Sequence, residues 1–266
     1  MQVTIVISYY KALTNLKLIL KALNFQSNNS FEVIISEDDQ NEETVSFLTN
    51  NKSQYNFPIE HICQKEDAGF RKNAMLNRSI IKAKNDLLVF IDGDCIPNKH
   101  FVKEYIKNSE KAKILTGRRV NLGENTSKSL INSFSLDKLN LLSLIFSDTK
   151  KVKEAIYFPY FKLFYKQRGL CGCNWGILKE HLLQVNGFDE DYQNPGVGED
   201  TDIEWRLKQS GFEMKSVKNK AIVFHIYHPR IYSASAVKIN YDIFQERKKA
   251  NAIRCSNGIE KAIKQI

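Results

Sequence analysis

The first hundred residues alternate between short apolar runs and helix-length segments, and this alternation constrains the fold more than any other feature of the sequence. The runs have the composition of strands that are buried on both faces of a sheet. The segments between them carry apolar residues at helical spacing. We therefore expect a mostly parallel α/β sheet flanked by helices. The expected strands are 3–8, 31–36, 59–63 and 87–91, and the expected helices are 13–25, one through 47–48, and 71–82.

The second half of the chain is less regular. Asn98 is expected to cap a helix that runs to Glu110, and a helix that starts near Thr201 is expected to end at Gly211. Residues 127–168 are rich in aromatic side chains, which is typical of a packed insertion but also fits a lid or an acceptor surface. No internal repeat or low-complexity linker divides the chain, so we expect one compact domain with a C-terminal extension. Further strands are expected at 113–120 and 172–177, and a strand followed by a loop at 221–229.

The composition is that of an ordinary globular protein, with 42% hydrophobic and 26% charged residues. No apolar run approaches the ~18–20 residues that span a membrane. The first residues lack a basic stretch and a small-residue cleavage site, so we expect a cytoplasmic protein without a signal peptide. The five scattered cysteines favour reduced thiols over a disulfide framework.

The formal net charge is +9, and the densest basic cluster lies late, in residues 244–254. Such a segment is either a solvated surface helix or a contact with anionic lipid or a partner, which would bring the protein to the inner face of the membrane. A basic balance is also compatible with a non-catalytic module that binds nucleic acid. The chain carries no nucleic-acid-binding motif, and acidic clusters stand at the predicted cleft, so we expect no nucleic-acid partner.

Polar side chains collect where three of the predicted strands end. Ser8 ends the first strand, residues 37–39 end the second, and Asp92 and Asp94 follow the fourth. In parallel sheets ligands bind outside the carboxyl ends of the strands, so these side chains predict a binding cleft. No G-x-G-x-x-G follows the first strand, which argues against a dinucleotide-binding oxidoreductase.

Asp92 and Asp94 are separated by a single glycine directly after an apolar strand. Two carboxylates so placed suit Mg²⁺ or Mn²⁺, which often complete their coordination with substrate phosphates. The alternative is a solvated loop that merely follows a strand.

Two later clusters each have a structural and a functional interpretation. Glu199 and Asp200 open a helix, where carboxylates are ordinary capping residues, but a carboxylate beside a metal-bound substrate can also act as a general base. His225 and His228 follow a strand; each alone is more typical of a structural histidine, whereas beside a carboxylate site one imidazole is a candidate third ligand.

Taken together, six segments resemble family 2 inverting glycosyltransferases of the GT-A fold, and the later ones are similar to the galactosyltransferase and chondroitin-polymerase-like branch. The resemblance covers residues 1 to about 230, with the motifs in the expected order. It departs from the family at the second strand, where Glu37 takes the first acidic place and no glycine follows. The segments are "VTIVISYY", "FEVIISEDDQNEET", "LLVFIDGDCIP", "GCNWGI", "GFDEDYQNPGVGEDTDIEWRL" and "VFHIYHP".

The resemblance implies a GT-A domain over residues 1–232, with a Rossmann-like nucleotide-binding half at 1–112 and an acceptor-binding half at 113–232. Residues 233–266 would be a basic helical extension. The implied reaction moves a hexose or N-acetylhexosamine from a UDP-sugar to a hydroxyl of a glycan or lipid-linked acceptor, in surface polysaccharide synthesis. A nucleotidyltransferase of similar fold is the alternative, although no glycine-rich, basic triphosphate loop follows the first strand.

The family's functional positions also map onto this sequence. Asp94 matches the metal ligand of the D-x-D motif, for Mn²⁺ or Mg²⁺, and His225 matches the late metal ligand, with His228 close enough to remain an alternative. Asp200 matches the catalytic base and Glu199 an acceptor-binding residue. The nucleotide-binding positions are Ser8, Asp38, Arg71 and Asp92, of which Asp92 contacts either ribose or metal.

Asn174 and Trp175 are candidates to line a sugar site, because aromatic faces stack on sugar rings. A tryptophan at this place is equally typical of a hydrophobic core.

Overall fold

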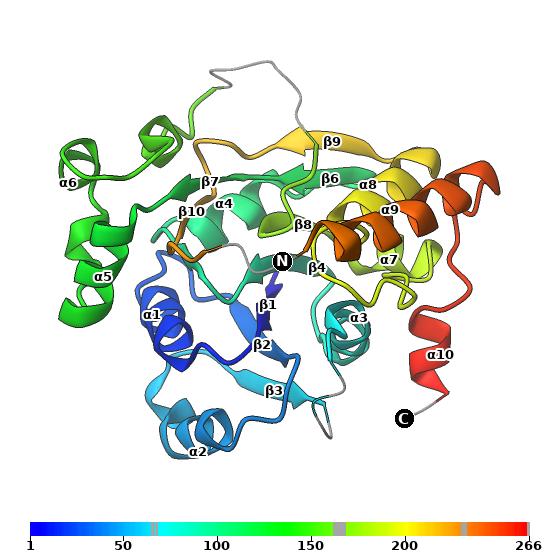
Figure 1. Cartoon of the computed structure of the whole chain (residues 1–266). Coiled ribbons are helices and arrows are strands. Elements are labelled where there is room, and N and C mark those ends of the chain that lie inside the picture. Colours follow the sequence, from blue (N-terminus) through cyan, green and yellow to red (C-terminus); the bar gives the residue numbers. More distant parts are fainter. Residues whose placement is uncertain (65–66, 68, 162–168, 230–232, 265–266) are drawn as a thin grey trace.

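The computed structural model describes residues 1–64, 67, 69–161, 169–229 and 233–264. Its centre is a seven-stranded sheet in the order β3-β2-β1-β4-β8-β6-β9 (Figure 1). The first four of these strands are parallel, β8 is antiparallel to both of its neighbours, and β9 is parallel to β6. The strands are β1 (Val3–Tyr9), β2 (Phe31–Glu37), β3 (Ile59–Cys63), β4 (Leu87–Asp92), β6 (Lys113–Thr116), β8 (Asn174–Leu178) and β9 (Glu213–Ser216).

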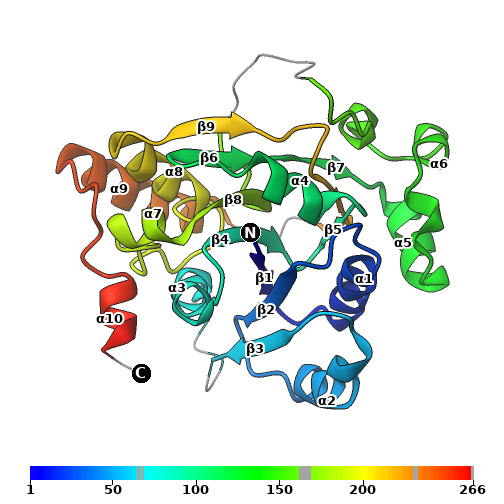
Figure 2. The same cartoon turned by 180° about the vertical axis from the view of Figure 1, so that it is seen from behind.

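Helices cover both faces of this sheet, as the apolar runs predict. One hydrophobic cluster packs α1, α2 and α4 against one face, and a second cluster packs α3, α7 and α8 against the other. The two layers can be followed from front and back in Figures 1 and 2. The helices are α1 (Leu13–Asn24), α2 (Glu42–Asn51), α3 (Lys72–Lys82), α4 (Phe101–Asn108), α7 (Lys179–Gln184) and α8 (Asp200–Gln209). The mostly parallel α/β sheet flanked by helices, which the sequence predicts, is confirmed.

A second, three-stranded sheet differs from the prediction. It has the order β5-β10-β7, formed by β5 (Cys95–Pro97), β10 (Ile222–His225) and β7 (Arg118–Asn121). The single strand expected at 113–120 is wrong, because the chain leaves the large sheet at Gly117. A Cβ atom at Gly117 would lie 2.2 Å from the Asn174 amide, so only glycine allows this crossing. The helix expected to start after Asn98 begins at Phe101 and ends at Asn108.

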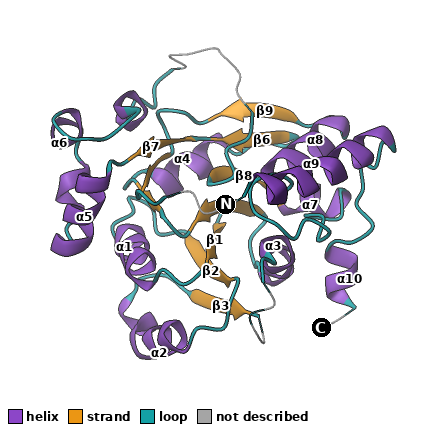
Figure 3. Cartoon of the chain, viewed as in Figure 1, coloured by secondary structure: helices purple, strands orange, loops and turns teal. Residues whose placement is uncertain are grey.

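Between β7 and β8 the chain forms a helical insertion, which is shown by secondary structure in Figure 3. It contains α5 (Glu124–Ser133), α6 (Leu141–Ile145) and two short 3₁₀ turns, Leu136–Leu139 and Val152–Ala155. The Asp148 carboxylate closes the base of the insertion by accepting bonds from the Asn125 and Thr126 amides at the start of α5. This agrees with the helical or irregular insertion expected at 127–168, of which residues 162–168 lie outside the described part.

The C-terminal residues form α9 (Ala234–Lys249) and α10 (Ile259–Ile263). Both contact the domain: Phe244 of α9 packs edge-on against Trp205 of α8, and Ile259 of α10 belongs to the cluster around α3. Within the described residues, none of the helices combines the length and the apolar composition that crossing a membrane requires.

Candidate active site

Three adjoining hollows lie at the carboxyl ends of β1, β2 and β4. The strand-end pocket, of about 640 Å³, is lined by Ser8 and Asp38. The central cleft, of about 910 Å³, contains Asp94, and the side recess, of about 260 Å³, contains Asp200. Asp92 lines all three, so the first aspartate of the D-x-D segment stands where the hollows meet.

The glycine between the two aspartates lets strands β1 and β4 approach closely. The Gly93 amide donates to the Ser8 carbonyl at 2.6 Å, and a Cβ atom at this position would lie only 2.9 Å from that oxygen. Any other residue would therefore push Asp92 and Asp94 away from the end of β1.

Asp94 lies among nitrogen atoms from the second sheet. Its Oδ2 is 3.0 Å from Nε2 of His228 and 3.5 Å from Nε2 of His225. Pairing of β10 with β5 sets His225 opposite Cys95, and the Ile226 amide donates to the Asp94 carbonyl, so the backbone fixes this approach. One ligand atom from each of the three side chains lies within 4.8 Å of the others. The sequence left His225 and His228 as alternatives, whereas the structure brings both to Asp94.

The charges of this cluster depend on one another. Burial disfavours the Asp94 carboxylate, but the hydrogen bond from His228 and the charge of His225 outweigh burial and lower the pKa of Asp94. Burial lowers the pKa of His225, whereas the hydrogen bond to Asp94 raises the pKa of His228. A buried neutral imidazole beside an ionised carboxylate is a state that can ligate a metal.

Lys72 is a site residue that the sequence analysis missed. Its Nζ lies 2.8 Å from Asp92 and 2.9 Å from Glu199, so it joins β4 to the start of α8. Burial opposes the charge on Lys72, but the two carboxylates raise its pKa well above the usual value. Among the described residues Lys72, and not Arg71, lines the central cleft and the strand-end pocket.

Arg71 serves the site through its backbone. Its amide donates to both oxygens of Asp38, at 3.1 and 2.9 Å, while its guanidinium turns to the Phe70 carbonyl. Gln64 also donates to Asp38, at 2.7 Å. Burial raises the pKa of Asp38 to about 6, despite the Arg71 amide. The prediction of Asp38 in a nucleotide pocket is compatible with this position, and that of Arg71 stays a prediction, since Lys72 is the basic side chain that lines the pocket in the described part of the chain.

Glu199 and Asp200 stand at the start of α8 and share the side recess, and Glu199 also lines the central cleft. Glu199 occupies the N-cap position of α8, but its side chain makes no capping hydrogen bond within the described residues and is bound by Lys72 instead. Burial raises its pKa even though Lys72 opposes that effect. Asp200 lines the recess, where the Thr201 hydroxyl donates to it at 3.2 Å. Gly198, at φ +108°, makes the tight turn before them, and a Cβ there would meet the Tyr192 ring at 2.0 Å.

Asn174 and Trp175 do not reach the site. Trp175 is 2% exposed and stacks on Phe90 at 4.6 Å between ring centroids, because β8 lies inside the sheet between β4 and β6. The Asn174 amide donates to the carbonyls of Arg118 and Ala221, and its oxygen accepts from Tyr105. The sugar-contact prediction for both residues is therefore wrong, and the core alternative describes Trp175.

The loop before α8 is held by the C-terminal helix. Asn240 of α9 is completely buried and donates to the carbonyls of Asn194 and Val197, each at 2.6 Å. Arg247 binds Asp189 at 2.9 Å and also binds Asp191. These contacts tie α9 to residues 189–197, which include two residues that line the central cleft, Pro195 and Gly196.

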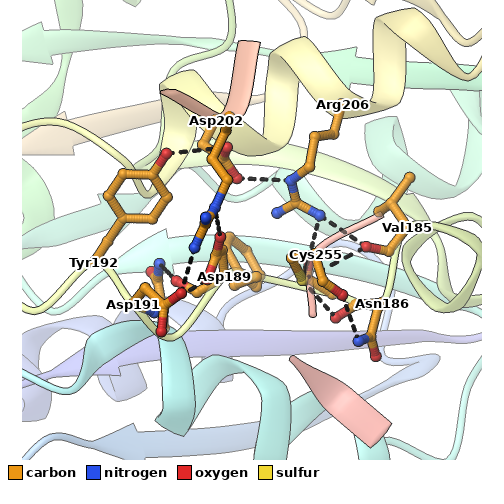
Figure 4. Close-up of polar contacts among 12 residues, drawn as sticks. Val185, Asn186, Asp189, Asp191, Tyr192, Asp202, Arg206 and Cys255 are labelled. Atoms are coloured by element: carbon orange, nitrogen blue, oxygen red, sulfur yellow. Dashed lines mark hydrogen bonds and ion pairs between the residues drawn. The ribbon is translucent and has the colours of Figure 1, made fainter. Parts of the chain in front are cut away.

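A buried arginine anchors the other side of the same loop (Figure 4). Arg206 of α8 binds Asp202 at 2.7 Å and the carbonyls of Val185 and Gly187 at 2.8 and 2.7 Å. Tyr192 donates to Asp202 at 3.2 Å. The segment that carries Glu199 and Asp200 is thus fixed from α8 and from α9.

The sequence and the fold were compared with known proteins. The chain is 27% identical over 242 residues to chondroitin synthase of Escherichia coli. This alignment covers 84% of this chain and 34% of the relative. The chain therefore spans about a third of that protein. Among solved structures, the mannosyltransferase PcManGT from Pyrobaculum calidifontis, in complex with GDP-Man and Mn²⁺, has a TM-score of 0.60 at 15% identity, over 98% of this chain and 68% of its own. Staphylococcus aureus TarS 1–349 in complex with UDP-GlcNAc has a TM-score of 0.59 at 11% identity, over 98% and 69%.

The two structures share the fold with this chain. A family model described as "Glycosyltransferase like family 2" matches residues 1–238, which include both sheets and every residue of the three hollows named above. This match favours sugar transfer over the nucleotidyltransferase and binding-module alternatives. The chain belongs to the glycosyltransferase-like family 2 and has the GT-A fold of the two solved structures.

Proposed function

We propose that this chain transfers a hexose or N-acetylhexosamine from a UDP-sugar to a hydroxyl of a glycan or lipid-linked saccharide, in surface polysaccharide synthesis. The transfer inverts the anomeric carbon and depends on a divalent metal. The observation that carries the proposal is the cluster of Asp94, His225 and His228 in a cleft that also meets the Asp200 recess through Asp92. The cytoplasmic location and the contact with a membrane stay predictions.

The donor set of the cluster fits Mn²⁺ better than Mg²⁺. One carboxylate and two imidazoles offer mixed oxygen and nitrogen ligands, whereas Mg²⁺ strongly prefers oxygen. Bound there, the metal would neutralise the negative charge that develops on the departing diphosphate. Asp92 is paired with Lys72 and lies outside this ligand cluster in the described residues, so we assign Asp92 to the ribose.

The strand-end pocket is our candidate for the nucleoside. Ser8 and Asp38 line it at the ends of β1 and β2, and Asp92 connects it to the metal cluster. Asp38 would accept or donate a hydrogen bond to the base according to its protonation, because its raised pKa lies near the physiological range. Lys72 lines the pocket and the cleft, where its charge would also face the diphosphate.

Asp200 is the better placed of the two neighbouring carboxylates to act as the base. Glu199 is engaged by Lys72 at 2.9 Å, whereas Asp200 accepts only from the neighbouring Thr201 hydroxyl among the described contacts. Asp200 would take the proton of the acceptor hydroxyl as that oxygen attacks the anomeric carbon from the face opposite the leaving diphosphate. A single displacement of this kind converts an α-linked donor into a β-linked product.

The test measures UDP release from a panel of UDP-sugars with Mn²⁺, with and without a chelator. We expect chelation to abolish turnover, and Asp200→Asn to lower kcat at least about 100-fold with little change in the donor KM. Asp242→Asn, on the exposed side of α9, is the matched control and should retain activity. Turnover that survives chelation would refute the metal dependence, and full activity of Asp200→Asn would refute the assignment of the base.

A further inference from the structure

The side recess has an unusual charge distribution. Three cations line it: Arg118 and Arg119 at the start of β7, and Lys151 directly before the second 3₁₀ turn of the helical insertion. None of the three forms an ion pair with a carboxylate within the described residues, although many lysines and arginines elsewhere do. Residues 162–168, which precede the recess in sequence, contain no aspartate or glutamate.

Neutral groups hold the two arginines in place. Arg118 Nη1 donates to the carbonyls of Gly117 and Gly169, at 2.9 and 3.0 Å, and Arg119 Nη1 contacts the Cys173 sulfur at 3.7 Å. Carbonyls and a thiol orient a guanidinium without cancelling its charge. The arginines are therefore positioned, partly buried and still positive.

The carboxylates of the recess are mostly engaged elsewhere. Asp92 and Glu199 share the Lys72 ammonium, and Glu154 is paired with Lys218 at 3.4 Å. Asp200 lies beside the three cations. When the partner lysines Lys72 and Lys218 are included, five cations face the four carboxylates, so the recess is positive overall. Its volume of about 260 Å³ is suited to a single sugar unit rather than to a whole nucleotide.

Two of the three cations lie apart from the central cleft and the strand-end pocket, where the nucleotide-sugar donor is proposed to bind. Of the three hollows in the described residues, Arg118 and Lys151 line the recess alone, whereas Arg119 also lines the central cleft. A negative group bound by Arg118 and Lys151 would lie beside Asp200, away from the strand-end pocket. The donor diphosphate is therefore the weaker candidate for this charge.

We propose that the acceptor carries an anionic group, a carboxylate or a phosphate, on the sugar unit that receives the transfer, and that Arg118, Arg119 and Lys151 bind this group in the side recess. The inference rests on the proposed function, since it assumes that the hydroxyl activated by Asp200 belongs to this same unit. The pairing orients that unit, because a planar guanidinium binds a carboxylate or phosphate through two parallel hydrogen bonds.

The experiment measures equilibrium binding of simple probes to the full chain with UDP and Mn²⁺ present. Methyl β-glucuronide is compared with methyl β-glucoside for the carboxylate arm, and glucose 6-phosphate with glucose for the phosphate arm. We expect one acidic probe to bind at least about tenfold more tightly than its neutral partner, with an advantage that shrinks as salt is raised. The arm that shows the advantage identifies the source of the charge.

Variants connect the preference to the recess. Arg118→Gln and Lys151→Gln should each reduce the acidic-to-neutral affinity ratio several-fold, whereas Lys153→Gln, an exposed lysine two residues away, should leave it unchanged. Equal affinity for acidic and neutral probes, no measurable binding of either acidic probe, or a ratio unaffected in both recess variants would overturn the inference. Failure of the proposed function looks different, because no UDP-sugar would then be turned over by the unsubstituted chain.

Discussion

Asn240 offers the sharpest test of how the C-terminal helix supports the active site. Its side chain is completely buried and donates to two backbone carbonyls, those of Asn194 and Val197, in the loop that leads to Asp200. Asn240→Ala would leave both carbonyls, which are partly buried, without these donors. Each unsatisfied group of this kind costs about 1–3 kcal/mol, so we expect a total loss of about 3 kcal/mol in the free energy of unfolding. For a domain of this size that corresponds to a fall in Tm of roughly 6–12 °C.

The variant Asn240→Asp makes the loss of stability at the same position depend on pH. An ionised carboxylate has no proton to donate and would face two carbonyl oxygens in a buried position, so folding should raise its pKa above the unfolded value of about 3.9. The protonated carboxyl group of this variant could still donate one bond. The contribution of this carboxyl group to stability is therefore complete below about pH 4 and is lost as the pH rises through its folded-state pKa.

The assay is thermal unfolding between pH 4 and 8 for the unsubstituted chain, the two Asn240 variants and the Asp242→Asn control on the same helix. Relative to the unsubstituted chain, the Asn240→Asp deficit in Tm should widen as the pH rises, while the Asn240→Ala deficit stays constant. The reasoning is refuted if Asn240→Ala loses less than about 2 °C, or if the Asn240→Asp deficit does not change with pH.

Three further predictions follow from single contacts. Lys72→Met should lower kcat/KM in steady-state kinetics at least about tenfold, because Asp92 and Glu199 lose their shared cation. The control variant Lys82→Met, at the exposed end of α3, should show no such loss. Burial raises the pKa of Asp38 to about 6, above its ordinary value of 3.8. Its contribution to stability is therefore complete below about pH 4 and is lost as the pH rises through 6. Between pH 4 and 6, Tm should fall more in the unsubstituted chain than in Asp38→Asn. Trp175→Ala should lower the free energy of unfolding, measured in urea, by about 3–5 kcal/mol. A loss under about 1 kcal/mol together with weakened sugar binding would contradict the place of Trp175 in the core.

The sequence was sufficient for the parallel half of the sheet because the relevant signals are local. Strands β1, β2 and β4 are buried almost throughout, and the apolar composition of these runs predicts that burial. The D-x-D segment was recognisable for the same reason, since Asp92 ends β4 and Asp94 follows within two residues. The match of His225 to the metal position came from the family resemblance. Its contact with Asp94 depends on the pairing of β10 with β5, and β5 was not predicted because three residues carry too little periodicity.

Lys72 and Trp175 show why the rest could not be read from local pattern. Lys72 looks like an ordinary lysine in the first turn of a helix, and its partners lie 20 and 127 residues further along the chain. The signal that could have found it is weak: a second basic residue directly after Arg71 in "FRKNAM". Trp175 was a candidate for sugar contact because aromatic faces stack on sugar rings, but insertion of β8 between β4 and β6 buries both faces of the strand.

The C-terminal helix is the clearest case of a role hidden from hydrophobic periodicity. Asn240, Phe244 and Arg247 have the spacing i, i+4 and i+7, which places them on one face of α9. Two of these three residues are polar, so the sequence pattern predicts a solvent-exposed face. In the structure this face binds the loop before Asp200 and packs on Trp205. The family match ends at residue 238, before all three. Part of the support of the loop before Asp200 therefore comes from residues outside the matched region. A substitution at Asn240 can change how this chain holds the proposed base without touching any residue that the family match includes.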